Sequence, residues 1–244
     1  MPEANDRVSR LAILIDADNS NPARLPALLA EIAKYGNASV RRAYGNWTSG
    51  HLGGWKGGLL EHSIQPMQQF NYTTGKNATD SFLIIDAMDL LYAGKLDGFC
   101  IISSDSDFTR LAARIREQGL TVYGFGERKT PQAFVAACDK FIYTENLGDE
   151  APVKAGAKPA TKLKRDRTLD NLLAEAVEAA SDDEGWAHLG AVGSNLQRLR
   201  SDFDTRSYGF AKLKDLMVAH PGYVLESRKG PDGKATMVYV RKKD

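Results

Sequence analysis

Acidic side chains stand at three points of this 244-residue chain where their type and spacing can do chemistry. Asp16 and Asn19 follow the apolar run LAILI. Asp105 and Asp107 follow the run FCII, and Asp80 lies near the start of a long segment of helical character. Carboxylates held close together repel and raise one another's pKa. A divalent cation relieves that repulsion, and a set of oxygen ligands suits Mg²⁺ or Mn²⁺ rather than zinc.

A cation bound to these acids would favour one kind of reaction. It can generate hydroxide from water and stabilise the charge that builds on a phosphoryl oxygen. The pattern therefore predicts metal-dependent hydrolysis of phosphodiester bonds. Each acid also has a structural interpretation, because Asp is common in turns and at helix starts, and Asp105 can simply cap the next helix. The coincidence of acids at two strand ends and one helix start is what favours the metal site.

The elements that must position these acids alternate strands with helices through residues 8–147. Apolar runs without polar alternation are typical of strands that helices cover on both faces. The alternation predicts an α/β fold, a Rossmann-like three-layer sandwich around a central parallel sheet. In such a sheet ligands bind beyond the carboxyl ends of the strands, which is where the acids fall. We expect strands at 11–15, 39–44, 63–68, 99–103, 120–125 and 141–143, and helices at 22–35, 78–92, 108–118 and 132–138.

Composition excludes several classes of protein. The chain is 43% hydrophobic and 26% charged, which is ordinary for a globular protein. Its 32 Lys and Arg against 31 Asp and Glu exclude a uniformly basic surface, but not a local basic face. No apolar run approaches the ~18 residues of a membrane span. We therefore expect a cytoplasmic protein without a membrane segment, in which Cys100 and Cys138 are free thiols.

Composition changes after residue 147. Residues 151–168 contain six Lys or Arg, one acid and two prolines, without apolar periodicity. This predicts a flexible basic linker at 148–167 between domains at 8–147 and 168–244. In the second domain we expect helices at 169–180, 189–199 and 210–219, then strands at 223–225 and 237–240 around the turn signal GPDG. Three helices and a hairpin predict a small winged-helix domain.

Cations and aromatic residues indicate where nucleic acid would bind. Aromatic side chains interleaved with cations can stack bases and neutralise phosphates, and cations on a hairpin wing can contact phosphates. Packing in the core is the alternative for Trp55, and a solvated tail is the alternative for the C-terminal cations. The predicted contacts are Arg41, Arg42, Trp47, Trp55 and Lys56, Lys162, Lys164 and Arg165 in the linker, and Arg228, Lys229, Lys234 and Arg241 near the C-terminus.

The first domain resembles the NYN domain, in the LabA-like branch of the PIN-like nuclease superfamily. Three segments carry the resemblance: LAILIDADN, GKNATDSFLIIDAMDLLYAGKLDGF and ISSDSDFTRLAARIREQGLTVYGFGE. The resemblance implies a sandwich around a parallel sheet and Mg²⁺- or Mn²⁺-dependent cleavage of RNA. It implies that Asp16, Asp80 and Asp105 are the principal metal ligands, that Asp107 completes the cluster, and that Asn19 fills the polar position of the first motif.

The second domain resembles the LOTUS (OST-HTH) domain. The segments WAHLGAVGSNLQRLRSDFD and RSYGFAKLKDLMVAHPGYVLE carry this resemblance. It implies either RNA binding or docking of a protein partner.

Together these features predict a metal-dependent ribonuclease, or endoribonuclease, with a C-terminal RNA-binding module. One alternative is a regulatory RNA-binding protein whose acidic site is vestigial. Another is a phosphatase of the haloacid dehalogenase type, because Asp16, Ala17 and Asp18 match its opening DxD motif. That motif continues with Thr or Val at the position where Ser20 stands here.

Overall fold

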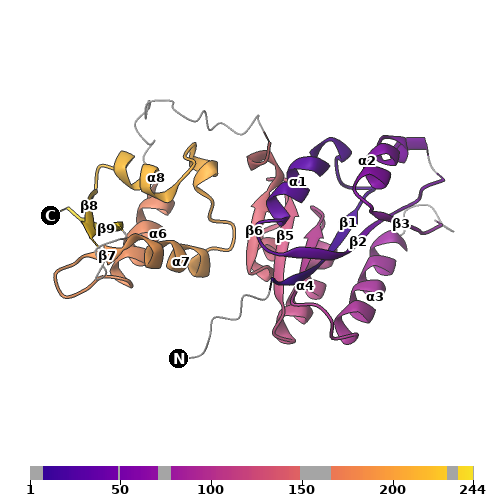
Figure 1. Ribbon diagram of the computed structural model, residues 1–244, viewed down its shortest axis with the longest axis horizontal. Coiled ribbons are helices and arrows are strands. Elements are labelled where there is room, and N and C mark those ends of the chain that lie inside the picture. Colours follow the sequence, from indigo (N-terminus) through magenta and orange to yellow (C-terminus); the bar gives the residue numbers. More distant parts are fainter. Residues whose placement is uncertain (1–7, 49, 71–77, 149–165, 230–235, 244) are drawn as a thin grey trace. The chain divides into compact units, whose positions relative to one another are not determined.

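Six parallel strands form the sheet of residues 1–150, one of two compact units of the chain; the other spans 151–244. The computed structural model in Figure 1 describes residues 8–48, 50–70, 78–148, 166–229 and 236–243. The strand order is β3-β2-β1-β4-β5-β6, so the chain winds outward from β1 in both directions. The strands are β1 (Arg10–Asp16), β2 (Asn37–Gly45), β3 (Gln65–Gln68), β4 (Gly98–Ile102), β5 (Thr121–Gly126) and β6 (Lys140–Tyr143).

Helices cover both faces of this sheet, as the non-alternating apolar strands predict. Figure 1 shows α1 and α2 on one face and α3 and α4 on the other. Residues of β1 alternate between the two cores: Ile13 and Ile15 belong to one cluster, and Ala12 and Leu14 to the other. The expected three-layer α/β sandwich is confirmed. The helices are α1 (Leu25–Ile32), α2 (Lys56–Glu61), α3 (Ala78–Tyr92), α4 (Thr109–Glu117) and α5 (Gln132–Ala137).

Short 3-10 turns lie where the sequence predicts longer helices or loops. The expected helix at 22–35 opens as a turn, η1 (Pro22–Arg24), because the Asn21 side chain accepts the N–H of Ala23 and Pro22 fixes the first position. The other turns of this unit are η2 (Gly50–Trp55), η3 (Ser106–Phe108) and η4 (Thr144–Asn146).

The second unit is a small helical domain with a three-stranded antiparallel sheet, as expected of a winged helix. Its sheet has the order β7-β9-β8, formed by Ala187–His188, Thr236–Lys242 and Tyr223–Lys229. The helices are α6 (Arg167–Glu178), α7 (Leu189–Leu199) and α8 (Leu213–Ala219), and a turn, η5 (Thr205–Tyr208), precedes α8.

Two details of this unit differ from the expectation. The short strand β7 is absent from the predicted elements, because two residues carry no periodicity. The third helix begins at Leu213 rather than at residue 210, after a turn that ends at Gly209 with a φ of 83°, a conformation that favours glycine.

Several expected features lie outside the described residues. They include most of the predicted linker and the hairpin turn, with the cations Lys162, Lys164, Arg165 and Lys234. Cys100 and Cys138 are free and buried, as expected. None of the described helices combines the length and the apolar character needed to cross a membrane.

Candidate metal centre

The sheet topology brings the predicted acids to one edge. β1 and β4 are hydrogen-bonded neighbours from Leu11 opposite Gly98 to Ile15 opposite Ile102, and the strand order reverses between them. Asp16 ends β1, and Asp105 precedes the turn η3 just beyond β4. A point of reversal in an open parallel sheet is the general location of ligand sites.

Three carboxylates meet at this edge. Asp80, Asp105 and Asp107 each offer an oxygen atom, and these atoms all lie within 4.8 Å of one another. Asp80 is buried, Asp105 is half-buried and Asp107 is exposed, so the group extends from the interior to solvent. An all-oxygen set of this kind fits a hard divalent cation. We refer to these three residues as the acidic triad.

The negative charges around Asp80 change its proton affinity. Burial, then the charges of Asp16, Asp105, Asp107 and Asp18, raise the pKa of Asp80 to about 6. Ionisation of Asp80 therefore costs free energy in the folded protein without a cation. A bound cation would offset this cost. The raised pKa of Asp80 is therefore a second property that fits a metal site, beside the set of oxygen ligands.

Asp16, a principal metal ligand by the family resemblance, ends β1 in the interior of the protein. It is fully buried and does not belong to the acidic triad among the described residues. Its Oδ2 accepts hydrogen bonds from Ser103 Oγ (2.7 Å) and Asn19 Nδ2 (3.1 Å), and its Oδ1 accepts the backbone N–H of Asn19 (3.3 Å). Burial raises the pKa of Asp16, and the hydrogen bonds from Ser103 and Asn19 oppose that rise. Asp16 is thus a buried carboxylate whose oxygen atoms already accept hydrogen bonds from Ser103 and Asn19.

Ser103, which the sequence analysis does not single out, joins the two strand ends. Its hydroxyl donates to Asp16 and accepts the backbone N–H of Asp105 (3.1 Å). Asp105 Oδ1 in turn accepts the N–H of Asp107 (2.9 Å). The structural interpretation of Asp105 as a cap is therefore correct, and the same carboxylate also belongs to the triad.

A second network of side-chain contacts, around Asp18, is not predicted by the sequence analysis. Asp18 Oδ2 accepts the hydroxyl of Thr79 (3.0 Å), and Asp18 Oδ1 lies 3.3 Å from Nε2 of His51. Because Thr79 precedes Asp80, the first contact ties the start of α3 to the end of β1. The sequence indicates this network only through the spacing of Asp18, two residues after Asp16 at the strand end.

Two predicted RNA contacts near β2 need correction. Trp55 is 1% exposed and packs in the core beneath α1 and α2, so its ring cannot stack on a base. Arg42 forms an ion pair with Asp86, whose other oxygen accepts the hydroxyl of Tyr44. The guanidinium therefore neutralises an internal carboxylate.

The remaining residues of that predicted surface are partly engaged. Arg41 donates to the carbonyl of His62 (3.0 Å), and the indole N–H of Trp47 donates to the carbonyl of Met67 (3.0 Å). Lys56 is exposed. Of the five predicted contacts on this segment, Lys56 is the one that the structure leaves most open to solvent.

Two of the predicted cations of the second unit, Arg228 and Arg241, stack on aromatic rings. The guanidinium of Arg228 lies over Trp186 and over Tyr239, each at 4.7 Å, and that of Arg241 lies 4.8 Å from the Trp186 ring centre. Lys229 is exposed beside them. Trp186, Arg228, Tyr239 and Arg241 therefore form one cationic aromatic surface on the wing sheet.

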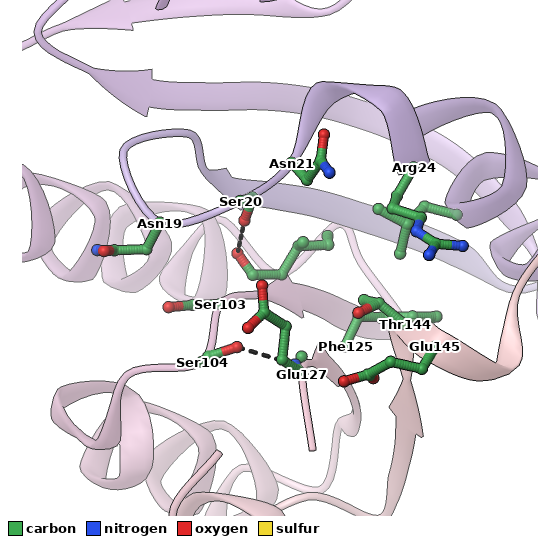
Figure 2. Close-up of a pocket in the computed structure, with 13 residues that line it drawn as sticks. Asn19, Ser20, Asn21, Arg24, Ser103, Ser104, Phe125, Glu127, Thr144 and Glu145 are labelled. Carbon is green, nitrogen blue, oxygen red and sulfur yellow. Dashed lines mark hydrogen bonds between the residues drawn. The ribbon is translucent and has the colours of Figure 1, made fainter. Parts of the chain in front are cut away.

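A cavity of about 140 Å³ lies beyond the carboxyl ends of β4, β5 and β6 (Figure 2). Asn19 and Ser103, the two residues that hold Asp16, also line it. Ser103 therefore connects the cavity with the acidic triad, because it also accepts the backbone N–H of Asp105.

Comparisons with known proteins identify both parts of the chain. Residues 10–146 match the model of the NYN domain, and residues 163–235 match that of the OST-HTH/LOTUS domain. A crystal structure of a protein of unknown function from Vibrio parahaemolyticus is 19% identical, with a TM-score of 0.49, over 56% of this chain and 93% of that one. A solution structure of an uncharacterized protein from Nitrosomonas europaea is 40% identical, with a TM-score of 0.30, over 38% of this chain and 86% of that one. No curated protein gave a match.

The raised pKa of Asp80 predicts a pH-dependent stability. Between the ordinary value of 3.8 and about 6, the folded wild type holds a proton that the unfolded chain has lost, so its stability falls as pH rises. Asp80→Asn removes this loss, and we expect its stability advantage in EDTA to grow across that range. Urea unfolding from pH 4 to pH 7 measures it. Asp89→Asn, an exposed position on the same helix, is the control, and a pH-independent difference would contradict the assignment.

The hydroxyl of Ser103 is expected to stabilise the fold through Asp16. Ser103→Ala leaves a buried carboxylate without one of its donors, which costs about 1–3 kcal/mol of unfolding free energy. The exposed neighbour Ser106→Ala should change it by less than about 0.5 kcal/mol. Chemical denaturation of both variants decides the matter, and equal stabilities would show that the Asp16 contact contributes little.

Proposed function

This chain belongs to the NYN domain family, and on that premise we propose that it is a ribonuclease that hydrolyses RNA phosphodiester bonds with a divalent cation. The observation that carries the proposal is the convergence of Asp80, Asp105 and Asp107 within 4.8 Å inside the matched segment. These residues come from two separate elements, and burial makes one of them costly to ionise.

The roles of the acids follow from their positions. Asp80, Asp105 and Asp107 would hold Mg²⁺ or Mn²⁺, which when bound supplies an activated water and stabilises charge on the phosphate. Asn19 and Ser103 donate three hydrogen bonds to Asp16, which favour its ionised form against the burial that raises its pKa. When ionised, Asp16 adds negative charge that strengthens cation binding at the triad.

The second domain would supply the affinity for RNA. We propose domain bounds of 8–147 and 168–244 with a basic linker at 148–167. The exposed Lys229 and the stacked Arg228 and Arg241 can neutralise phosphates on the wing, while Trp186 supports both guanidinium groups. A tether raises the effective concentration of RNA at the triad without changing the triad itself. Docking of a protein partner is the other use that the LOTUS match supports.

The phosphatase alternative fits the structure poorly. It requires Asp16 to attack a phosphate, but Asp16 has no exposed surface and its oxygens accept bonds from Ser103 and Asn19. The regulatory alternative, with an inactive acidic site, is separated from the nuclease proposal by experiment.

Substitution in the triad tests the nuclease proposal. We expect Asp105→Asn to lower cleavage of labelled RNA in Mn²⁺ by at least about 100-fold, because it removes a charged ligand, while RNA binding persists. EDTA should abolish wild-type cleavage. Asp89→Asn, exposed on α3, should retain activity. Cleavage by Asp105→Asn at the wild-type rate would show that the activity comes from a contaminant and end the proposal.

Substitution on the wing tests the source of affinity. Arg241→Ala is expected to weaken RNA binding and to reduce the dependence of log K on log salt by about 0.7, the share of one phosphate contact with a single strand. Arg198→Ala, an exposed cation on α7, serves as the charge-matched control. Fluorescence anisotropy across a salt series measures both variants, and identical slopes would place the RNA elsewhere.

A further inference from the structure

The cavity beside the acidic triad has the size of one aromatic ring system. Its volume is about 140 Å³, and an apolar protein cavity of about 150 Å³ holds one benzene molecule. Three core side chains, Leu28, Ile102 and Phe125, line part of it, and each is almost fully buried. The six-membered ring of a base, which carries its Watson–Crick edge, can therefore enter and contact the apolar wall, whereas a whole nucleotide would not fit inside.

The rest of the lining is polar and can read the edge of a ring. Figure 2 shows the carboxylate of Glu127 directed into the cavity from the end of β5, with Glu145 and Arg24 at its rim. The backbone N–H of Glu127 donates to Ser104 Oγ (2.9 Å), and this hydrogen bond holds the backbone of Glu127 in place. Its carboxylate also pairs with the exposed Lys129 at 2.8 Å, a contact that solvent screens.

The charges of the residues that line the cavity disfavour a phosphate group inside it. Two carboxylates and one guanidinium give the cavity a formal charge of −1, and Arg24 already donates to the carbonyl of Leu147 (3.1 Å). The triad and Asp16 add further negative charge nearby. A neutral group with hydrogen-bond donors on its edge is the ligand that this environment favours.

We propose that this cavity is a nucleobase subsite that prefers guanine, a proposal that rests on the proposed ribonuclease function. Guanine presents N1–H and the N2 amine side by side, so one carboxylate can accept both, as an unpaired base in single-stranded RNA permits. The Watson–Crick edges of adenine, cytosine and uracil do not offer two adjacent donors. Glu127 is the residue that reads this edge.

The position of the cavity links the base to the reaction. Asn19 and Ser103 line it and also hold Asp16, and Ser103 contacts the backbone of Asp105. We expect a base in the cavity to place its own ribose and phosphate toward the acidic triad. The subsite would therefore set which phosphodiester is cut.

Binding of mononucleotides tests the subsite without catalysis. In EDTA, saturation-transfer NMR with the full chain should give a stronger signal for guanosine 5′-monophosphate than for adenosine 5′-monophosphate. Glu127→Gln should lose this difference, since one acceptor becomes a donor, and Glu117→Gln, exposed on α4, should keep it. Equal signals for the two nucleotides with the wild type would overturn the proposal.

Cleavage of substituted RNA tests its consequence with the wild-type protein alone. Single-stranded oligonucleotides that carry guanine, inosine or adenine at one position should be cut next to guanine about tenfold faster, the order of one bidentate contact. Inosine lacks the N2 amine, so it isolates that contact. Asp105-dependent cleavage without this preference would overturn the subsite and leave the nuclease intact. Glu127-dependent guanine binding without any cleavage would do the reverse.

Discussion

Repulsion among carboxylates at one edge of the sheet is the constraint on which the rest of this site depends. Burial, then the charges of Asp16, Asp105, Asp107 and Asp18, raise the pKa of Asp80 to about 6. The fold tolerates this charge because Asp16 and Asp18 each receive donors from side chains, Ser103 and Thr79 among them. Asp80 lies among these charges, so a cation bound at the triad would stabilise its ionised form.

The sheet order explains why the charges meet at all. Asp16 and Ser103 are 87 residues apart in sequence, but β1 and β4 are adjacent because the chain turns back past β1 after completing β2 and β3. The cavity forms at the same edge of the sheet and is lined by residues that follow β1, β4, β5 and β6. One feature of the topology therefore places a charged site and a ring-sized cavity beside each other.

The sequence allowed the fold to be predicted more fully than the site. The apolar runs at β1 and β4 and the periodicity of α3 carry local signals, so the elements and the sandwich followed from them. The role of Ser103, the contact of His51 with Asp18 and the cavity depend on which side chains meet after folding. Trp55 is a residue for which the sequence suggests a role that the fold does not allow. Its aromatic neighbours and the adjacent lysine suggest an RNA-binding surface, but its ring packs in the hydrophobic core.

The acidic site also explains why such a protein would need a separate RNA-binding part. The net charge of the chain is only +1, and the negative edge of the sheet repels the phosphates that it is proposed to cleave. Affinity must then come from cations held elsewhere. The guanidinium of Arg241 keeps its charge while the Trp186 ring limits its motion, and Arg228 on the same ring also forms an ion pair with Glu226. Joining that surface to the triad through a chain allows each to be optimised without weakening the other.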